Sequence, residues 1–129
     1  MYSQKFIDFA KEYYKDASHP LAVASNFKEL TDEWVVALFH DILEDTQIKE
    51  NDLFMFLTRY DRNKVYLEIT KITRKKEESY FDYINRLKKE NDVAMRVKIA
   101  DLRHNLSRTE TLKPSLKQRY EKALKILLS

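Results

Sequence analysis

The sequence predicts an all-α protein with a compact multi-helix fold, and three observations support this prediction. The 129-residue chain has no glycine and only two prolines, so residues that interrupt helices are nearly absent. Charged residues make up 35% of the chain and apolar residues 43%, a balance typical of amphipathic helices. Apolar residues recur at helical spacing along most of its length. With no shift in composition, we expect one domain over residues 1–129.

The first half of the chain predicts three helices. Apolar and aromatic residues recur at helical spacing over residues 3–15, at Phe6, Phe9, Ala10, Tyr13 and Tyr14. A second helix should begin near Ser18, because Pro20 suits a first helical turn, where its missing N–H costs nothing. Thr31 is the expected N-cap of a third helix, which continues through the strongly apolar run 34–43. We expect this third helix to be the centre of the fold.

The second half predicts five further helices. Residues 49–60 and 63–73 form two of them, and the stripe Tyr80, Tyr83, Ile84 and Leu87 marks the next. Another runs from Val93 to about Leu106. The last follows Pro114 and presents Leu116, Tyr120, Ala123, Leu124 and Leu127. That apolar face either closes the core of its own domain or mediates a homodimer, and the sequence leaves both open.

Composition excludes several classes of function. The net charge of +3 comes from 24 basic and 21 acidic residues that are scattered along the chain, so nucleic-acid binding has no special support. The absence of cysteine excludes disulfides and thiolate metal sites. No apolar run is long enough for a membrane helix, and no N-terminal segment resembles a signal peptide. We therefore expect a cytoplasmic protein without a membrane partner.

The segment ALFHDILEDT, residues 37–46, places charge inside an apolar run. On the central helix, four-residue spacing places Glu44 one turn above His40, and Asp45 one turn above Asp41. A buried carboxylate without a partner costs several kcal/mol, so such groups are usually paired or bound to metal. This pattern predicts a polar patch of four residues in the otherwise apolar central helix, where the carboxylates are paired or bind a metal.

A second intrusion of charge lies in the segment VAMRVKIADLRHNL, residues 93–106. Asp101 continues the line of Val93 and Val97 at four-residue spacing, so it should face the core. Together with His19 at a helix start, the two segments offer two imidazoles and two carboxylates. Such a set suits Mn, Fe, Co, Ni or Zn better than Ca. His104 shares the helix but has no further partner in the sequence, so we expect it to be exposed or capping.

Each of these residues also has a structural explanation. His19 could merely begin a helix, and His40 could be a core histidine bonded to a backbone carbonyl. Asp41 or Asp101 could be one end of a buried ion pair. Their joint occurrence, rather than any single residue, favours a metal site.

Three segments, HPLAVA at 19–24, ALFHDILEDT at 37–46 and VKIADLRHNLS at 97–107, together resemble the HD-domain phosphohydrolases. The resemblance spans about residues 6–110. It is strongest to the hydrolase domain of RelA/SpoT-type enzymes, which remove the 3′-pyrophosphate of guanosine tetraphosphate (ppGpp), and to their small stand-alone relatives. An HD-domain fold and phosphohydrolase activity on a nucleotide are what this resemblance implies.

The resemblance also implies roles for particular residues. The expected metal ligands are His19, His40, Asp41 and Asp101, with manganese as the usual metal. Glu44 and Asp45 match the acidic pair that orients or activates the attacking water. Lys98 and Asn105 match residues near the nucleotide, and either Thr70-Lys71 or Thr73-Arg74 matches a threonine-basic segment, so Lys71 and Arg74 are the remaining substrate-binding candidates.

One departure from the family pattern concerns the nucleotide base. The relatives carry a basic, glycine-containing segment before the HP pair that helps hold guanine, and this chain has KEYYKDAS there, at residues 11–18. Two alternatives therefore stay open beside ppGpp hydrolysis. The chain could hydrolyse another nucleotide or phosphorylated metabolite, or it could be a regulatory module that binds metal or nucleotide without turnover.

Overall fold

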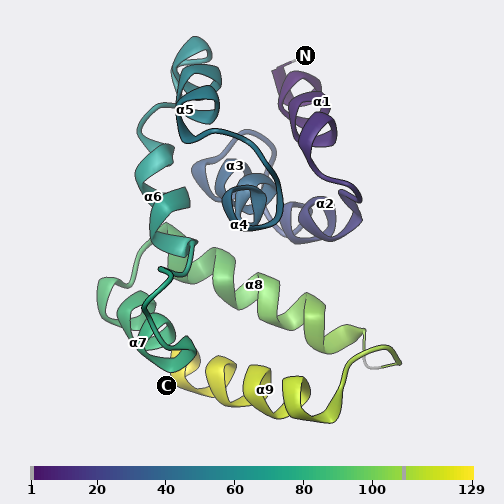
Figure 1. The fold of residues 1–129 in the computed structure, drawn as a ribbon, viewed down its shortest axis with the longest axis vertical. Helices are drawn as coiled ribbons and strands as arrows, with labels where there is room; N and C mark the ends of the chain where they lie inside the picture. Colours follow the sequence, from purple (N-terminus) through teal and green to yellow (C-terminus); the bar gives the residue numbers. More distant parts are fainter. Residues whose placement is uncertain (1, 109) are drawn as a thin grey trace.

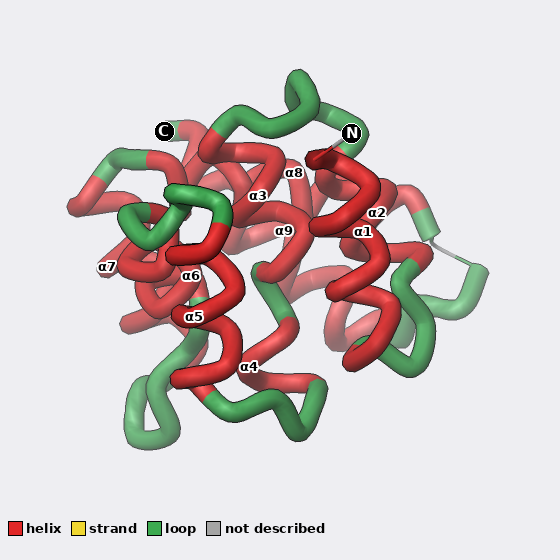
Figure 2. Tube along the Cα trace, turned by 90° about the horizontal axis from the view of Figure 1, so that it is seen from above, coloured by secondary structure: helices red, strands yellow, loops and turns green. Residues whose placement is uncertain are grey.

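The computed structural model describes residues 2–108 and 110–129, and over these residues the chain consists of helices joined by turns and loops (Figures 1 and 2). This confirms the all-α prediction. The helices of the described residues are α1 (Tyr2–Tyr13), α2 (Ser18–Ala24), α3 (Asp32–Phe39), α4 (Ile42–Asp45), α5 (Glu50–Arg59), α6 (Val65–Ile72), α7 (Tyr80–Glu90), α8 (Val93–Ser107) and α9 (Pro114–Leu128).

Helix α3 lies at the centre of the fold, as the sequence predicted. Every residue from Trp34 to Phe39 is buried, and the helix packs against α1, α2, α6 and α8. The hydroxyl of Thr31 accepts a hydrogen bond from the Trp34 amide at 3.2 Å, which satisfies one of the free donors of the first turn. The buried position of α3 fixes the location of His40 and Asp41, which follow its last turn.

The predicted helix does not continue unbroken to Leu43, which corrects the sequence interpretation. Helix α3 ends at Phe39 and α4 begins at Ile42, so His40 and Asp41 lie in the turn between them. The carbonyl of Ala37 would accept from the Asp41 amide in a continuous helix. It lies instead 2.6 Å from the ring Nδ1 of His40 and 3.4 Å from the His40 amide. The histidine side chain thus takes the acceptor that the next helical residue would need.

Helices α8 and α9 form an antiparallel pair at one side of the molecule. Figure 1 shows them side by side, joined by a loop at one end, with α7 alongside. Ala123 and Leu127 of α9 are buried in the hydrophobic core that α7 and α8 also contribute to. The apolar face of the last helix therefore closes the core of its own chain.

A chain without glycine must end its helices with other residues. Asn91 ends α7 in the left-handed region at φ 49°, and Leu30 and Asp61 also have positive φ. Asparagine and aspartate tolerate this region better than most residues, whereas leucine there is unusual. No helix in the described part of the chain combines the length and the apolar character that crossing a membrane requires.

Candidate metal centre and its cavity

Four side chains from three separate parts of the chain converge on one point. His19 comes from the start of α2, His40 and Asp41 from the turn after α3, and Asp101 from the middle of α8. Each offers one ligand atom, and these atoms all lie within 4.8 Å of one another. The convergence follows from the packing of α3 against both α2 and α8. All four residues that the sequence predicted as metal ligands are therefore neighbours.

The orientation of His40 indicates what this cluster can hold. Its Nδ1 donates to the carbonyl oxygen of Ala37 at 2.6 Å, since a carbonyl is an acceptor only. Its Nε2 lies 3.1 Å from Oδ2 of Asp41 and 3.3 Å from Oδ1 of Asp101. In neutral His40 this nitrogen carries a lone pair, which two carboxylates would repel. The geometry therefore requires a proton on Nε2 or a cation in the same place.

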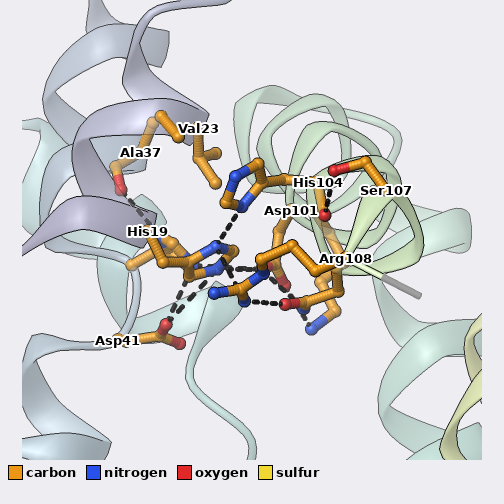
Figure 3. Close-up of polar contacts among 12 residues, drawn as sticks. His19, Val23, Ala37, Asp41, Asp101, His104, Ser107 and Arg108 are labelled. Carbon is orange, nitrogen blue, oxygen red and sulfur yellow. Dashed lines mark hydrogen bonds and ion pairs between the residues drawn. The ribbon is translucent and has the colours of Figure 1, made fainter. Parts of the chain in front are cut away.

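His19 is the fourth member of the cluster. Its Nε2 lies 2.7 Å from Oδ1 of Asp101 and 3.9 Å from Oδ2 of Asp41. Figure 3 shows its ring between Asp41 on one side and His104 on the other. Nδ1 of His19 lies 2.6 Å from Nδ1 of His104. The expectation that His104 has no partner and is exposed or capping is therefore wrong, because α2 packs against α8 and brings His19 to it.

The pKa values of the cluster reflect buried charges that compensate one another. Burial by itself raises the pKa of Asp101. The Lys98 ammonium and the His40 ring lower it by a larger amount, so the pKa lies well below its usual range. Burial likewise lowers the pKa of His40, but the carboxylates of Asp101 and Asp41 raise it well above 6.5. Asp101 is only 3% exposed, and Lys98 Nζ lies 2.9 Å from its Oδ2. Without a metal, protons and Lys98 balance these carboxylates.

The acidic pair Glu44 and Asp45 lines the same cavity as the four candidate ligands. Burial raises the pKa of both carboxyl groups, and the negative charge of Asp41 raises it further. Glu44 also accepts a hydrogen bond from the backbone amide of Arg74 at 2.7 Å. Both residues nevertheless keep part of their surface exposed. They are free to interact with a water or a ligand next to the cluster.

The cavity has a volume of about 420 Å³ and combines acidic, basic and aromatic walls. Beyond the cluster and the acidic pair, its polar and aromatic lining consists of Arg74, Tyr80, Tyr83, Lys98, Asn105, Arg108, Arg119 and Tyr120. Arg119 of α9 stacks on the Tyr80 ring at 4.8 Å, with Arg74 5.8 Å from the same ring centroid. The hydroxyl of Tyr80 is buried and has no hydrogen-bond partner among the described residues. Such a donor is available to a ligand.

The cavity brings together three of the four predicted substrate-binding residues. Arg74, Lys98 and Asn105 line it, and Asn105 donates to Oδ1 of Asp101 at 3.2 Å. Lys71 does not line it, which corrects the sequence assignment. Its ammonium lies 2.9 Å from Glu68 and 2.7 Å from Asp92, and this ion pair ties α6 to the start of α8.

Sequence reasoning missed Arg108, Arg119 and the three tyrosines of the lining. The tyrosines were assigned to apolar stripes, and a tyrosine at helical spacing in the sequence does not reveal whether its face meets a core or a cavity. Arg119 is adjacent in sequence to Tyr120 of the last apolar stripe, and this pairing of an arginine with a tyrosine is a signal by which Arg119 could be predicted as a binding residue.

The chemistry available here is that of a cation-binding cluster beside a cavity with both acids and guanidinium groups. The set of nitrogen and oxygen donors fits a transition metal, and an acid pair and several basic side chains stand next to it. Comparison with models of known protein families gave no match for this chain, and a search of curated proteins gave no relative. Its function is therefore inferred from the residues that line the cavity.

Proposed function

We propose that this chain is a metal-dependent phosphohydrolase that acts on a nucleotide or another phosphorylated small molecule. Removal of the 3′-pyrophosphate from ppGpp is the specific reaction to test first, because the three quoted segments resemble enzymes of that type. The observation that carries the proposal is the orientation of His40, whose Nε2 faces two carboxylates while a backbone carbonyl holds its Nδ1.

The four converging side chains fit a divalent metal ion in their chemistry. A ligating histidine usually donates its other ring N–H to a carbonyl or carboxylate, which fixes the ring and its tautomer, and Ala37 supplies that acceptor for His40. Asp101 is also held by a hydrogen bond, since the Lys98 ammonium donates to its Oδ2. Two imidazoles and two carboxylates suit manganese and its neighbours in the transition series. His19, His40, Asp41 and Asp101 would hold the ion.

The remaining acids would handle the water that hydrolysis consumes. A divalent ion in such a site lowers the pKa of water and polarises a phosphoryl oxygen. Glu44 or Asp45 would orient the attacking water and take its proton as the new bond from oxygen to phosphorus forms and the bond to the leaving group breaks. Their raised pKa values favour this role, since a base works best when its pKa approaches the operating pH.

The basic residues of the lining would bind the phosphate groups. Lys98 already faces Asp101, so Arg74, Arg108 and Arg119 are the cations best placed for a substrate. Guanidinium groups bind phosphate through two parallel hydrogen bonds and stabilise the charge that spreads over its oxygens. The three guanidinium groups in the lining favour a phosphorylated substrate over a neutral one.

The lining of the cavity suggests which residues would bind phosphate groups more clearly than which would bind a nucleotide base. Residues 11–18, which replace the basic segment of the ppGpp hydrolases, do not contribute to the described lining of the cavity. Recognition of guanine would therefore need other groups, and Tyr80 and Tyr120 are the aromatic surfaces at hand. A substrate panel must therefore extend beyond guanine nucleotides.

The test combines metal binding with hydrolysis. Calorimetry should detect Mn²⁺ binding to the purified chain, and a panel of ppGpp, nucleoside triphosphates, deoxynucleotides and cyclic nucleotides should reveal release of phosphate or pyrophosphate. Asp41→Ala should lose both properties. Asp8→Ala is the matched control, because Asp8 is an exposed carboxylate whose contact is with Gln4 on its own helix.

Two outcomes would contradict the proposal. If the wild type and Asp41→Ala have the same metal content and the same activity, the cluster is not a catalytic metal site. If the wild type binds Mn²⁺ tightly but hydrolyses nothing in the panel, the regulatory module becomes the better interpretation.

A further inference from the structure

The rings of His19 and His104 stack against each other beside the candidate metal centre. Their centroids are 4.8 Å apart with 24° between the planes, and their Nδ1 atoms are 2.6 Å apart (Figure 3). At this separation one nitrogen must donate a hydrogen and the other must accept it. Either His19 or His104 is therefore the donor.

The choice of donor decides what His19 offers on its other side. If neutral His19 donates from Nδ1, its Nε2 carries a lone pair that faces the cluster, 2.7 Å from Oδ1 of Asp101. This is the form in which an imidazole binds a metal ion. If His104 donates instead, neutral His19 carries its hydrogen on Nε2 and bonds Asp101 directly. That form has no lone pair for an ion.

We propose that His104 is a positioning residue, which accepts the Nδ1 hydrogen of His19 and so holds His19 in the tautomer that binds a divalent ion. This inference rests on the proposed metal-dependent function and deepens it. It gives each candidate imidazole ligand its own acceptor, the Ala37 carbonyl for His40 and the His104 ring for His19. Helix α8 thus supplies one ligand, Asp101, and the residue that orients another.

Arg108 is the second neighbour of the same nitrogen, and it acts in the opposite direction. Its Nη2 lies 3.4 Å from Nδ1 of His19. A guanidinium only donates, so this contact favours the tautomer in which Nδ1 is an acceptor. It is longer than the contact with His104, and the same Nη2 donates to Asn105 at 2.6 Å. Loss of Arg108 should therefore not weaken metal binding.

Two substitutions at position 104 separate the acceptor from the ring. His104→Phe keeps a stacked ring but removes the acceptor, whereas His104→Gln keeps an acceptor oxygen without the ring. In calorimetric titrations with Mn²⁺, the phenylalanine variant should bind about 10- to 100-fold more weakly than the wild type, the usual effect of losing such a partner. The glutamine variant should recover most of this loss. Helical circular dichroism verifies that each variant is folded.

A spectroscopic measurement reports the tautomer itself. In the metal-free protein, long-range ¹H–¹⁵N correlation spectra should show a protonated Nδ1 on His19 in the wild type and in the glutamine variant. Arg108→Met is the control that removes the other neighbour, and it should bind Mn²⁺ at least as tightly as the wild type. If Arg108→Met and His104→Phe weaken binding equally, or if His104→Phe binds as tightly as the wild type, the positioning role is wrong.

Failure of this inference differs from failure of the proposed function. Equal Mn²⁺ affinity in the wild type and His104→Phe, with hydrolysis intact, would reject the role of His104 alone. Weakened Mn²⁺ binding in His104→Phe, without hydrolysis by the wild type, would support the role of His104 and reject the enzyme. A wild type that binds no divalent ion would overturn both.

Discussion

The carboxylate of Asp101 is divided between Lys98 and the candidate metal centre. Its Oδ2 lies 2.9 Å from Lys98 Nζ, while its Oδ1 faces the Nε2 atoms of His19 and His40 at 2.7 and 3.3 Å. Lys98 precedes Asp101 by three residues on α8, so the helix itself sets this pair. One oxygen is thereby held in place, and the other is left for the cluster.

Removal of Lys98 should destabilise the metal-free protein. Lys98→Met leaves the buried Asp101 without its nearest cation, and breaking a buried pair in this way typically costs about 3 kcal/mol or more. Urea denaturation in the presence of EDTA measures the free energy of unfolding. The double variant Lys98→Met with Asp101→Asn should regain part of the loss, because the unpaired charge is gone. Wild-type stability in Lys98→Met alone would show that Asp101 does not depend on this cation.

The stability of the metal-free protein should fall as the pH rises above about 6.5. Burial lowers the pKa of His40, but Asp101 and Asp41 raise it to a net value well above 6.5. Folded His40 then keeps a proton that the unfolded chain releases near pH 6.5. Its contribution is complete below that pH and is lost as the pH rises through the folded pKa. Thermal melts in EDTA at about pH 6 and about pH 8.5, one value on each side of the unfolded pKa, should give a lower melting temperature at the higher pH.

A non-titrating variant and the metal provide controls for this pH dependence. In His40→Gln the decline between the two pH values should be smaller than in the wild type, because the titrating ring is gone. Bound Mn²⁺ should act in the opposite sense, with a larger stabilisation at the higher pH, because the ion must displace the proton from the imidazole. An identical decline in the wild type and His40→Gln would contradict the raised pKa of His40.

The proposed binding of phosphate by the arginines of the cavity can be tested without knowledge of the substrate. Arg119 lines the cavity and stacks on Tyr80, whereas Lys122, one turn later on α9, stacks on Phe81 and is not part of the lining. Arg119→Gln should weaken the binding of pyrophosphate to the Mn²⁺-loaded protein about tenfold, the usual effect of a lost charged hydrogen bond of about 1.5 kcal/mol. Calorimetry should find the affinity of Lys122→Gln unchanged. Equal losses in both variants would indicate general attraction by the charge of α9.

Local patterns in the sequence were sufficient for most helices and for choosing the four side chains that converge. Asp101 could be placed in the core because it follows Val93 and Val97 at four-residue spacing. On a helix with 3.6 residues per turn, residues at this spacing lie on the same face. Thr31 was recognisable as an N-cap from its own residue type and its neighbours.

What the sequence left undetermined depends on contacts between distant residues. The helix breaks after Phe39 because the His40 ring competes for the Ala37 carbonyl. The spacing of apolar residues carries no information about such a side-chain hydrogen bond. His104 meets His19 across 85 positions of sequence, and Lys71 is held by Asp92 across 21. No local rule specifies either pair, since both depend on which helices pack together.

The acidic pair should separate turnover from metal binding. Asp45 lines the cavity but is not among the four candidate ligands, so Asp45→Asn should keep Mn²⁺ affinity near that of the wild type. Its rate should fall by about 10² to 10⁴ if Asp45 is the base, and the corresponding fall should occur in Glu44→Gln if Glu44 is. The amide of the Glu44 variant keeps an acceptor for the Arg74 backbone N–H, so the loop after α6 remains tied to α4.

The pH profile distinguishes a base from a group that only orients the water. Because burial raises the pKa of Asp45 and Glu44, the rate limited by either base should rise with pH through that raised value and then level off. Loss of the true base should remove this rise, whereas loss of an orienting residue should lower the rate at every pH and preserve the shape. Stopped-time assays of the wild type and both variants, with saturating Mn²⁺ at each pH, provide the comparison. Unchanged turnover in both variants would remove the acidic pair from the mechanism.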